Sequence, residues 1–399
     1  MIGGEIEIAP DELSLAGPIG DLDARMARIL QVEGKPHAWF GSAREAVRWW
    51  ATHLLPEGPV LLPSYGCESV VQPYREAGVE VRFYPVERDL SVDAGRVRPL
   101  ARGCQAIQVI HYFGFPANPA LFDLGVPVLE DAVQALLSPW ARVHGQWAIA
   151  SLRKFLPVPD GGLLVSRQSL ALPALPEARV AGPLAGAQPG SDPGDADVYG
   201  RKLLARMAKF RARRDGDVEA WWEAAADLEV TEEELDEAIV PRAMSRWSRA
   251  ALQGLDLDRM ATRRRENYRL LFGLLFGRDP SSAASPDRPN AVAAPSADSA
   301  PGVRPAISIR PLFDALPESV VPYGLPILCE RRDALMEYLV DQDIYTVIHW
   351  KLPPEVRRDD FPDSWWLFDR ILTLPIDHRY GDVEMRAIAR AVRDFAGRQ

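Results

Sequence analysis

Apolar residues follow two patterns in the first half of the chain. Short apolar runs that predict strands lie at 38–40, 59–62, 79–84, 106–113, 126–129, 147–152 and 163–165. Segments 43–54 and 67–77 instead carry apolar residues at helical spacing, with charged residues on the opposite face. This alternation predicts an α/β fold with a mostly parallel central sheet and flanking helices.

The pattern changes toward the C-terminus. Strands are predicted at 325–328, 345–350 and 371–374, and helices at 244–276, 331–341, 364–370 and 383–395. We therefore expect a large α/β domain over 1–250, with an N-terminal arm and a short helix at 21–30. A smaller C-terminal α+β domain is expected over 251–399.

Two segments lack periodicity. The stretch 169–197 predicts a surface excursion, and 278–305, rich in Ser, Ala, Pro and Asp, predicts a flexible insert. Between them, 198–214 predicts a basic amphipathic helix, and Thr231 is expected to open a short acidic helix through a capping box.

Composition and charge narrow the class of protein. A net charge of −10 and a pI near 5.3 argue against nucleic acid as a partner, because phosphate neutralisation requires a basic face. The cysteines Cys67, Cys104 and Cys329 form neither a metal spacing nor a disulfide framework. The first ten residues do not resemble a signal peptide, and no apolar run reaches the about 18 residues of a membrane span. We expect a soluble cytoplasmic protein with no metal and no membrane partner.

Candidate chemistry gathers where the predicted strands end. Gly41, Ser42 and Ala43 form a small-residue helix start, whose free N–H groups suit a phosphate. Asp131 follows one strand and Lys154 follows another. Ligands of parallel sheets bind at this edge. A lone lysine is more often a solvated surface residue, and a glycine–serine pair is more often an ordinary helix cap. Their joint occurrence favours a site.

Together these residues could serve an aldehyde cofactor that carries a phosphate and a pyridine ring. Lys154 could supply the amine of a Schiff base and later move a proton. Asp131 could keep the ring nitrogen protonated, and Gln134, one helical turn on, could donate to the phenolic oxygen.

These motifs and their order resemble those of a known family. Glu130-Asp131 is followed by Gln134, and Lys154 precedes Gly161 by seven residues. Other matches are Gly41-Ser42-Ala43, Pro63-Ser64 with Gly78, and His111-x-x-Gly114. The chain resembles the DegT/DnrJ/EryC1/StrS family of pyridoxal-phosphate-dependent aminotransferases, of fold type I, from about residue 38 to the C-terminus.

The resemblance implies an aminotransferase that moves an amino group from an amino acid to a keto or aldehyde acceptor. Nucleotide-linked keto sugars are the family's usual acceptors, and a homodimer is its usual assembly. It implies Lys154 and Asp131 as catalytic residues. The implied cofactor-binding residues are Gly41, Ser42, Ala43, Tyr65, Cys67, His111, Asp131, Gln134, Ser151 and Lys154. His349, His378 and Arg379 are candidate substrate contacts, with His349 placed first.

Three positions depart from the family pattern. Ile149 stands where the family usually has a phosphate-binding serine five residues before its lysine, and Ser151 is its candidate replacement. Cys67 aligns with the aromatic residue that covers the cofactor ring, so Tyr65 is a candidate for stacking. The asparagine lent by a partner subunit falls near Pro241-Arg242, where none stands.

Two other function classes remain open. The chain could be a non-catalytic relative that kept the fold as a binding or scaffold module. A dinucleotide-dependent oxidoreductase is disfavoured, because no G-x-G-x-x-G follows the first strand.

Overall fold

The computed structural model describes residues 1–9, 24, 27–28, 30–168, 175, 198–282 and 308–397. Most of the predicted helix at 21–30 lies outside the described residues. So do the predicted excursion at 169–197, except for residue 175, and the predicted insert at 278–305, except for 278–282.

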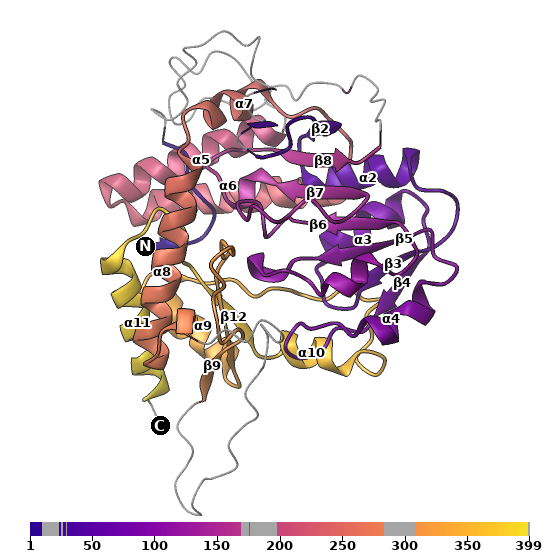
Figure 1. Cartoon of the computed structure of the whole chain (residues 1–399). Coiled ribbons are helices and arrows are strands. Elements are labelled where there is room, and N and C mark those ends of the chain that lie inside the picture. Colours follow the sequence, from indigo (N-terminus) through magenta and orange to yellow (C-terminus); the bar gives the residue numbers. More distant parts are fainter. Residues whose placement is uncertain are drawn as a thin grey trace, which may run out of the picture.

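The largest element is a seven-stranded sheet (Figure 1). Its strands are β2 (His37–Phe40), β3 (Val60–Pro63), β4 (Val81–Tyr84), β5 (Ala106–Ile110), β6 (Val128–Asp131), β7 (Trp147–Ser151) and β8 (Gly162–Ser166). Their order is β2-β8-β7-β6-β5-β3-β4. The pairs from β4 to β7 are parallel, whereas β8 runs antiparallel to both β7 and β2. The predicted mostly parallel sheet is confirmed.

Side chains that alternate along the strands give the sheet two buried faces. Ile149 of β7 and Leu164 of β8 share a core with Trp50 of helix α2 (Ala43–His53) and with helix α3 (Glu68–Glu76). The intervening residues of the same strands belong to a second core on the other face, which includes helix α5 (Val198–Asp215). Because both faces are covered, the strands consist almost entirely of apolar residues.

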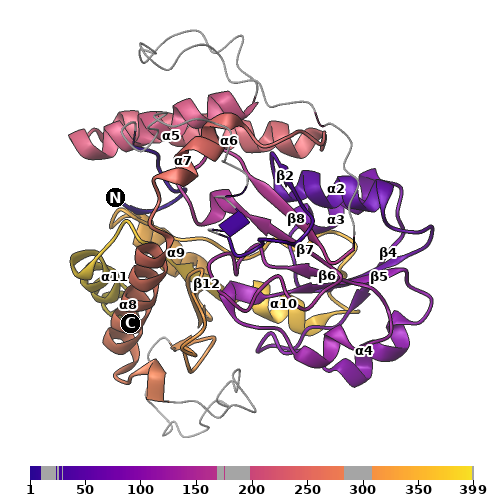
Figure 2. The ribbon, with the colours of Figure 1, turned by 45° about the horizontal axis from the view of Figure 1, so that its top comes forward.

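The helices after the sheet differ in part from the sequence prediction. The basic helix at 198–214 is confirmed as α5, which packs against α6 (Val218–Glu237). The predicted helix start at Thr231 is wrong, since Thr231 lies inside α6. Its hydroxyl donates to the Leu228 carbonyl at 2.7 Å, one turn back, so the threonine stays within the helix instead of capping it. In Figure 2 the α5–α6 pair lies along one side of the molecule.

The predicted long helix at 244–276 is two helices. Helix α7 (Arg246–Gln253) ends at Gly254, and α8 (Leu257–Phe276) begins after Asp256. The Asp256 carboxylate accepts a hydrogen bond from the Arg259 N–H at 2.9 Å, which caps the new helix.

A second, antiparallel sheet forms from the C-terminal part in the order β12-β10-β9. It contains β9 (Ile309–Pro311), β10 (Leu325–Cys329) and β12 (Ile371–Leu374). Helices α9 (Arg332–Val340), α10 (Pro362–Phe368) and α11 (Asp382–Ala396) accompany it. In Figure 1, α8 and α11 stand beside each other on the side away from the large sheet. The C-terminal part combines helices with an antiparallel sheet, as expected for an α+β unit. The domain boundary at residue 250 stays a prediction.

The predicted strand at 345–350 is wrong beyond Tyr345. Strand β11 (Ile344–Tyr345) is short and pairs in parallel with β1 (Ile2–Gly3) at the N-terminus. His349 and Trp350 turn inward, with ring centroids 5.6 and 5.9 Å from that of Phe113. Packing against this buried ring replaces a continued strand.

Candidate active site

The predicted site residues meet at one edge of the large sheet. Strands β5, β6 and β7 are parallel neighbours, and the register pairs Ile110 with Asp131 and Asp131 with Ile149. The carboxyl ends of these strands therefore bring His111, Asp131 and Ser151 into adjacent positions. Lys154 follows within the short turn η5 (Leu152–Lys154).

Asp131 is buried and held by two donors. Its Oδ2 accepts from Gln108 Nε2 at 2.7 Å, and its Oδ1 accepts from the Val133 N–H at 3.0 Å. Burial raises the pKa of Asp131, and these two hydrogen bonds and the charge of Lys154 oppose that rise. Gln108 in turn accepts from the Tyr74 hydroxyl at 2.7 Å. The carboxylate is thus fixed in orientation.

Gln108 is a functional residue that the sequence analysis missed. It is the one polar residue in the strand sequence Ala-Ile-Gln-Val-Ile of β5, and it is 1% exposed. A buried amide in an apolar strand requires a partner. That requirement was the available signal, but it does not reveal which residue the partner is.

Gln134 is buried with half of its amide unused. Its Oε1 accepts from the Phe113 N–H at 2.8 Å. Its Nε2 is buried and has no hydrogen-bond partner among the described residues. An unpaired buried donor costs free energy that an oxygen acceptor of a bound ligand would recover. Gln134 therefore presents a donor three residues after Asp131, and its contact to a phenolic oxygen stays a prediction.

Lys154 lies near Asp131 of the large sheet and near His349 of the C-terminal part. It is partly exposed, and it makes no hydrogen bond or ion pair in the part of the chain that the structure describes. Its charge favours the ionised form of Asp131 and disfavours protonation of His349. The amine of Lys154 is therefore near both side chains, with no competing partner among the described residues.

His349 supplies the C-terminal side of the site. Its imidazole is 4% exposed, and its Nδ1 lies 2.8 Å from Thr373 Oγ1. Burial, assisted by the charge of Lys154, lowers the pKa of His349 to about 3. His349 is therefore neutral at physiological pH. Its ring is close to Lys154, and its role as a substrate contact stays a prediction.

Tyr65 belongs to an aromatic cluster next to His349. Its hydroxyl donates to the His349 carbonyl, and its ring centroid is 5.6 Å from that of Trp350 and 5.9 Å from that of Tyr112. Cys67 is the N-cap of α3, and its Sγ lies 2.9 Å from Ser69 Oγ. Tyr65 is thus already packed on two rings, while Cys67 leaves the usual stacking position without an aromatic side chain.

His111 has both nitrogens engaged within the fold. Nδ1 accepts from the Ala117 N–H at 3.0 Å, so Nε2 carries the proton and donates to Glu130 Oε1 at 3.0 Å. Glu130 also accepts backbone N–H groups of three residues between 142 and 145. Burial opposes ionisation, but these donors outweigh it and lower the pKa of Glu130 to about 2. His111 positions the strand ends and offers no free nitrogen.

The predicted phosphate cradle is a tightly packed helix start. Ser42 is the N-cap of α2 and accepts from the Glu45 N–H at 3.2 Å, so its hydroxyl serves the cap. A Cβ at Gly162 would lie 2.2 Å from the Ser42 backbone, and one at Gly41 would lie 2.6 Å from Tyr199 Cε2. Only glycine permits these approaches. Ala43 follows as the first residue of the helix.

Glu45 reaches back to this helix start, which the sequence analysis did not foresee. Its carboxylate accepts from the Tyr199 hydroxyl and from the Arg242 N–H at 2.8 Å. Burial raises the pKa of Glu45 to about 7, although both donors oppose the rise. Pro241 and Arg242 of this same chain thus lie beside α2, where the family pattern has an asparagine from a partner subunit.

Positive charge accumulates next to the Lys154 turn. Arg153 and Lys202 both pair with Glu232 and with Glu5, and the 3.6 Å contact of Arg44 with Glu232 extends the group. Arg206 adds a fourth cation, 2.8 Å from Glu5. Three guanidinium groups thus face two carboxylates together with Lys202, whose pKa is lowered by burial and by the neighbouring arginines. The excess positive charge suits a bound anion.

Ser151 offers a hydroxyl at the carboxyl end of β7. It pairs with Gly162 in the sheet, and Gly162 touches Ser42. Ser151 is 3% exposed, and its hydroxyl makes no hydrogen bond among the described residues. Ile149 is instead buried in the apolar core against α2. The residues present therefore fit pyridoxal phosphate at both ends. Asp131 and Gln134 suit its ring, and Ser151, opposite Gly162 and next to the α2 helix start, suits its phosphate.

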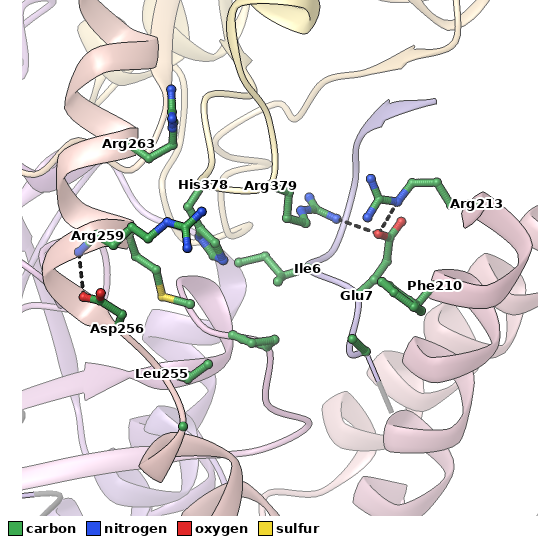
Figure 3. A pocket seen from close by; sticks show the side chains of 14 residues that line it. Ile6, Glu7, Phe210, Arg213, Leu255, Asp256, Arg259, Arg263, His378 and Arg379 are labelled. Atoms are coloured by element: carbon green, nitrogen blue, oxygen red, sulfur yellow. Dashed lines mark hydrogen bonds and ion pairs between the residues drawn. The ribbon is translucent and has the colours of Figure 1, made fainter. Parts of the chain in front are cut away.

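Arg379 and His378 line a cavity between the N-terminal arm, α5 and α8 (Figure 3), and their role as substrate contacts stays a prediction. Arg379 is bound to Asp377 at 2.7 Å. Among the described residues, no group of three or more His, Cys, Asp or Glu side chains is placed to hold a metal ion. No helix in the described ranges is long and apolar enough to span a membrane.

Comparison with known proteins finds structural but not sequence relatives. Neither protein-family models nor curated protein sequences match the chain. DesV of S. venezuelae, solved in complex with a ketimine intermediate, superposes with a TM-score of 0.62 at 17% identity, over 96% of this chain and 90% of that one. A DegT DnrJ EryC1 StrS aminotransferase from Brucella abortus superposes with a TM-score of 0.58 at 16% identity, over 96% of this chain and 91% of that one.

The PLP form of the candidate sugar aminotransferase Spr1654 from Streptococcus pneumoniae is a third structural relative. It gives a TM-score of 0.60 at 13% identity, over 99% of this chain and 93% of that one. The similarity covers nearly the full length of each protein. The chain therefore has the fold type I architecture of these aminotransferases.

Proposed function

We propose that this chain is a pyridoxal-phosphate-dependent aminotransferase. It would move an amino group from an amino acid to a keto or aldehyde acceptor, with nucleotide-linked keto sugars as the acceptor class. One observation carries the proposal. Lys154, without a partner among the described residues, lies near the fixed carboxylate of Asp131, and the unpartnered donor of Gln134 is buried nearby.

Each residue has a distinct task in this reaction. When bound, pyridoxal phosphate supplies an aldehyde for an amine and a ring that withdraws electrons. Asp131 holds a proton at the ring nitrogen, because Gln108 and the Val133 N–H keep its carboxylate in place. Gln134 donates to the phenolic oxygen, and Lys154 moves the α-proton of the amino acid.

The C-terminal part of the site excludes water from this chemistry. His349 is neutral beside Lys154, so it adds no charge that would compete with the amine. An apolar wall next to His349 is formed by the rings of Tyr65, Trp350 and Phe113. Low water content strengthens the interaction between Asp131 and a protonated ring nitrogen.

The structural relatives support the cofactor, and the description of Spr1654 as a sugar aminotransferase supports a sugar acceptor. DesV is described with a ketimine intermediate, and Spr1654 in a PLP form. We infer a homodimer and a cytoplasmic location from the family resemblance and the three free cysteines. Size-exclusion chromatography with light scattering tests the assembly, and a monomeric mass would contradict it.

Cofactor loading tests the central proposal. The purified chain mixed with pyridoxal phosphate should turn yellow, and borohydride should then attach the pyridoxyl group at Lys154, found by peptide mass spectrometry. Labelling at another lysine would show that Lys154 is misassigned. A screen of amino donors, glutamate first, against nucleotide-linked keto sugars would then identify the substrates.

A non-catalytic binding module is the second candidate. It is favoured by Glu45, whose carboxylate occupies the helix start where a phosphate is expected. In that case the protein would remain colourless at saturating pyridoxal phosphate, and no lysine would be labelled.

A further inference from the structure

The hydroxyl of Thr373 faces the imidazole of His349 at the edge of the proposed site. Thr373 lies in β12 and is 5% exposed. Its N–H donates to the carbonyl of Val347 at 2.9 Å, and the Val347 N–H donates to the Thr373 carbonyl at 3.3 Å. Val347 stands two residues before His349, so this pair of bonds holds the segment that carries the histidine against the strand.

The rotamer of Thr373 is fixed by its methyl group. A Cβ at Gly324 would lie 2.3 Å from Thr373 Cγ2, so the methyl occupies space that only a glycine leaves open. A threonine side chain is stiff about χ1, because two heavy atoms branch from its Cβ. With the methyl against Gly324, the hydroxyl is directed at His349, whose Nδ1 lies 2.8 Å away.

The direction of this hydrogen bond follows from what else the hydroxyl can reach. Among the described residues, Thr373 Oγ1 makes no hydrogen bond besides the one with His349. If Nδ1 carried the proton and donated, the hydroxyl hydrogen would be buried without an acceptor there, which costs free energy. If the hydroxyl donates instead, its hydrogen is satisfied and Nδ1 is the acceptor. The neutral imidazole then carries its proton on Nε2.

Three aromatic rings hold the imidazole of His349 in this orientation. They belong to Phe113, Tyr323 and Trp350, at interplanar angles of 88°, 83° and 85° to the imidazole. Their centroids lie 5.3 to 5.6 Å from the imidazole centroid. Turning the imidazole over, which would remove Nδ1 from Thr373, would displace these packed rings.

The other nitrogen, Nε2, is left for a ligand. It makes no hydrogen bond with any described residue, and the imidazole lies close to Lys154. An Nε2–H group donates to an oxygen, such as the carbonyl or a hydroxyl group of a keto sugar. Because the lone pair on Nδ1 is engaged by Thr373, His349 recognises such an oxygen as a donor and does not take a proton from the ligand.

We propose that Thr373 is a positioning residue that fixes the Nε2–H tautomer of His349, and that His349 thereby donates to an oxygen of the amino acceptor. The tautomer follows from the contacts alone, whereas the part played toward the amino acceptor rests on the proposed function. A site with one oriented donor disfavours an acceptor that lacks the matching oxygen, because the donor is then left unpaired.

Solid-state ¹⁵N NMR of the cofactor-free full chain, labelled with histidine that carries ¹⁵N at Nδ1 alone, tests the tautomer. The signal of His349, identified by its loss in His349→Gln, should be that of an unprotonated imidazole nitrogen. Thr373→Val should add a protonated Nδ1 signal, because the donor that favours the unprotonated form is lost, and Thr373→Ser should restore the wild-type signal. Thr262→Val, at an exposed position of α8, is the control and should change nothing. A protonated Nδ1 in the wild type, or an unaltered signal in Thr373→Val, would overturn the proposal.

Kinetics of the loaded enzyme tests the part played toward the amino acceptor, with the acceptor that the screen of nucleotide-linked keto sugars identifies. Thr373→Val should raise the KM for this acceptor by roughly three- to tenfold, the loss of one neutral hydrogen bond, and Thr373→Ser should lower it again. An unchanged KM beside an altered His349 signal would refute recognition by His349. A chain that takes up no cofactor would overturn the proposed function and this recognition with it, while the ¹⁵N signal decides the tautomer separately.

Discussion

Gln108 Nε2 lies 2.7 Å from Asp131 Oδ2, across the neighbouring parallel strands β5 and β6. Both side chains are buried, and Gln108 also accepts the Tyr74 hydroxyl. The Gln108 amide thus connects Asp131, the proposed partner of the ring nitrogen, to the buried Tyr74 of α3. The orientation of the Asp131 carboxylate is set from the interior, before any ligand arrives.

Gln108→Met should therefore destabilise the protein and disturb the site. It leaves the Tyr74 hydroxyl and one Asp131 oxygen buried without a partner, which costs about 1–3 kcal/mol for each group. Urea unfolding measures the loss of stability. Gln146→Met, at an exposed position, is the control and should change stability little. Equal stability of the two variants would show that the Gln108 bond contributes nothing.

Asp131→Asn should keep the fold and bind some cofactor, but react far more slowly. The amide can still accept from Gln108 but no longer stabilises a proton on the ring nitrogen. Loss of such an electrostatic contact reduces turnover by on the order of 10²–10³-fold. Steady-state kinetics of the loaded enzyme gives the rate constant. A rate equal to that of the wild type would refute the role of Asp131.

Lys154→Ala should leave the free energy of unfolding nearly unchanged, because the side chain is partly exposed and has no partner among the described residues. Amino transfer should fall by at least about 10²–10⁴-fold, the usual contribution of a positioned proton-transfer group. Single-turnover assays and thermal unfolding separate the two effects. Lys351→Ala, at an exposed lysine, is the control. Retained turnover in Lys154→Ala would identify another lysine as the catalytic group.

Glu45→Gln should change how stability depends on pH. The folded pKa of Glu45 is about 7, against an ordinary value of 4.5, so between these values the folded state keeps a proton that the unfolded state releases. The free energy of unfolding of the wild type then falls as pH rises through this window, by about 3 kcal/mol in total. The glutamine variant is neutral at every pH, so its free energy of unfolding does not fall for this reason.

Urea unfolding at pH 5 and pH 8 measures the difference. Relative to the wild type, Glu45→Gln should gain stability at pH 8 compared with pH 5. Glu57→Gln, at an exposed glutamate, should show the pH dependence of the wild type. Parallel pH profiles for Glu45→Gln and the wild type would mean that Glu45 is not held neutral by burial.

Asp160→Ala should destabilise the turn that follows Lys154. Asp160 is fully buried and accepts from the N–H and hydroxyl of Ser245, both at 2.7 Å, and from the Ser248 hydroxyl. Removing it leaves these donors unpaired at a cost of about 2–5 kcal/mol. Thermal unfolding measures this cost, with Asp227→Ala on the exposed side of α6 as control. A loss as small as that of the control would contradict the importance of this network.

The sequence by itself determined the fold class and the approximate positions of the strands. Periodicity located all seven strands of the large sheet, because both faces are buried and the strands are continuous apolar runs. Since parallel strands end at one edge, local positions were enough to select Asp131, Gln134 and Lys154 as a group. Local patterns failed at Thr231 and beyond Tyr345, where tertiary contacts overrode them.

Only the tertiary structure decided the environment of these residues. Gln108, Glu45 and Asp160 each meet partners distant in sequence or on a neighbouring strand, and no local spacing encodes such contacts. The same holds for His111, whose two nitrogens are already bonded within the fold. Burial and hydrogen bonding depend on what surrounds a side chain in space. The sequence could therefore name the chemical groups of the site, and the fold determined which of them remain available to a ligand.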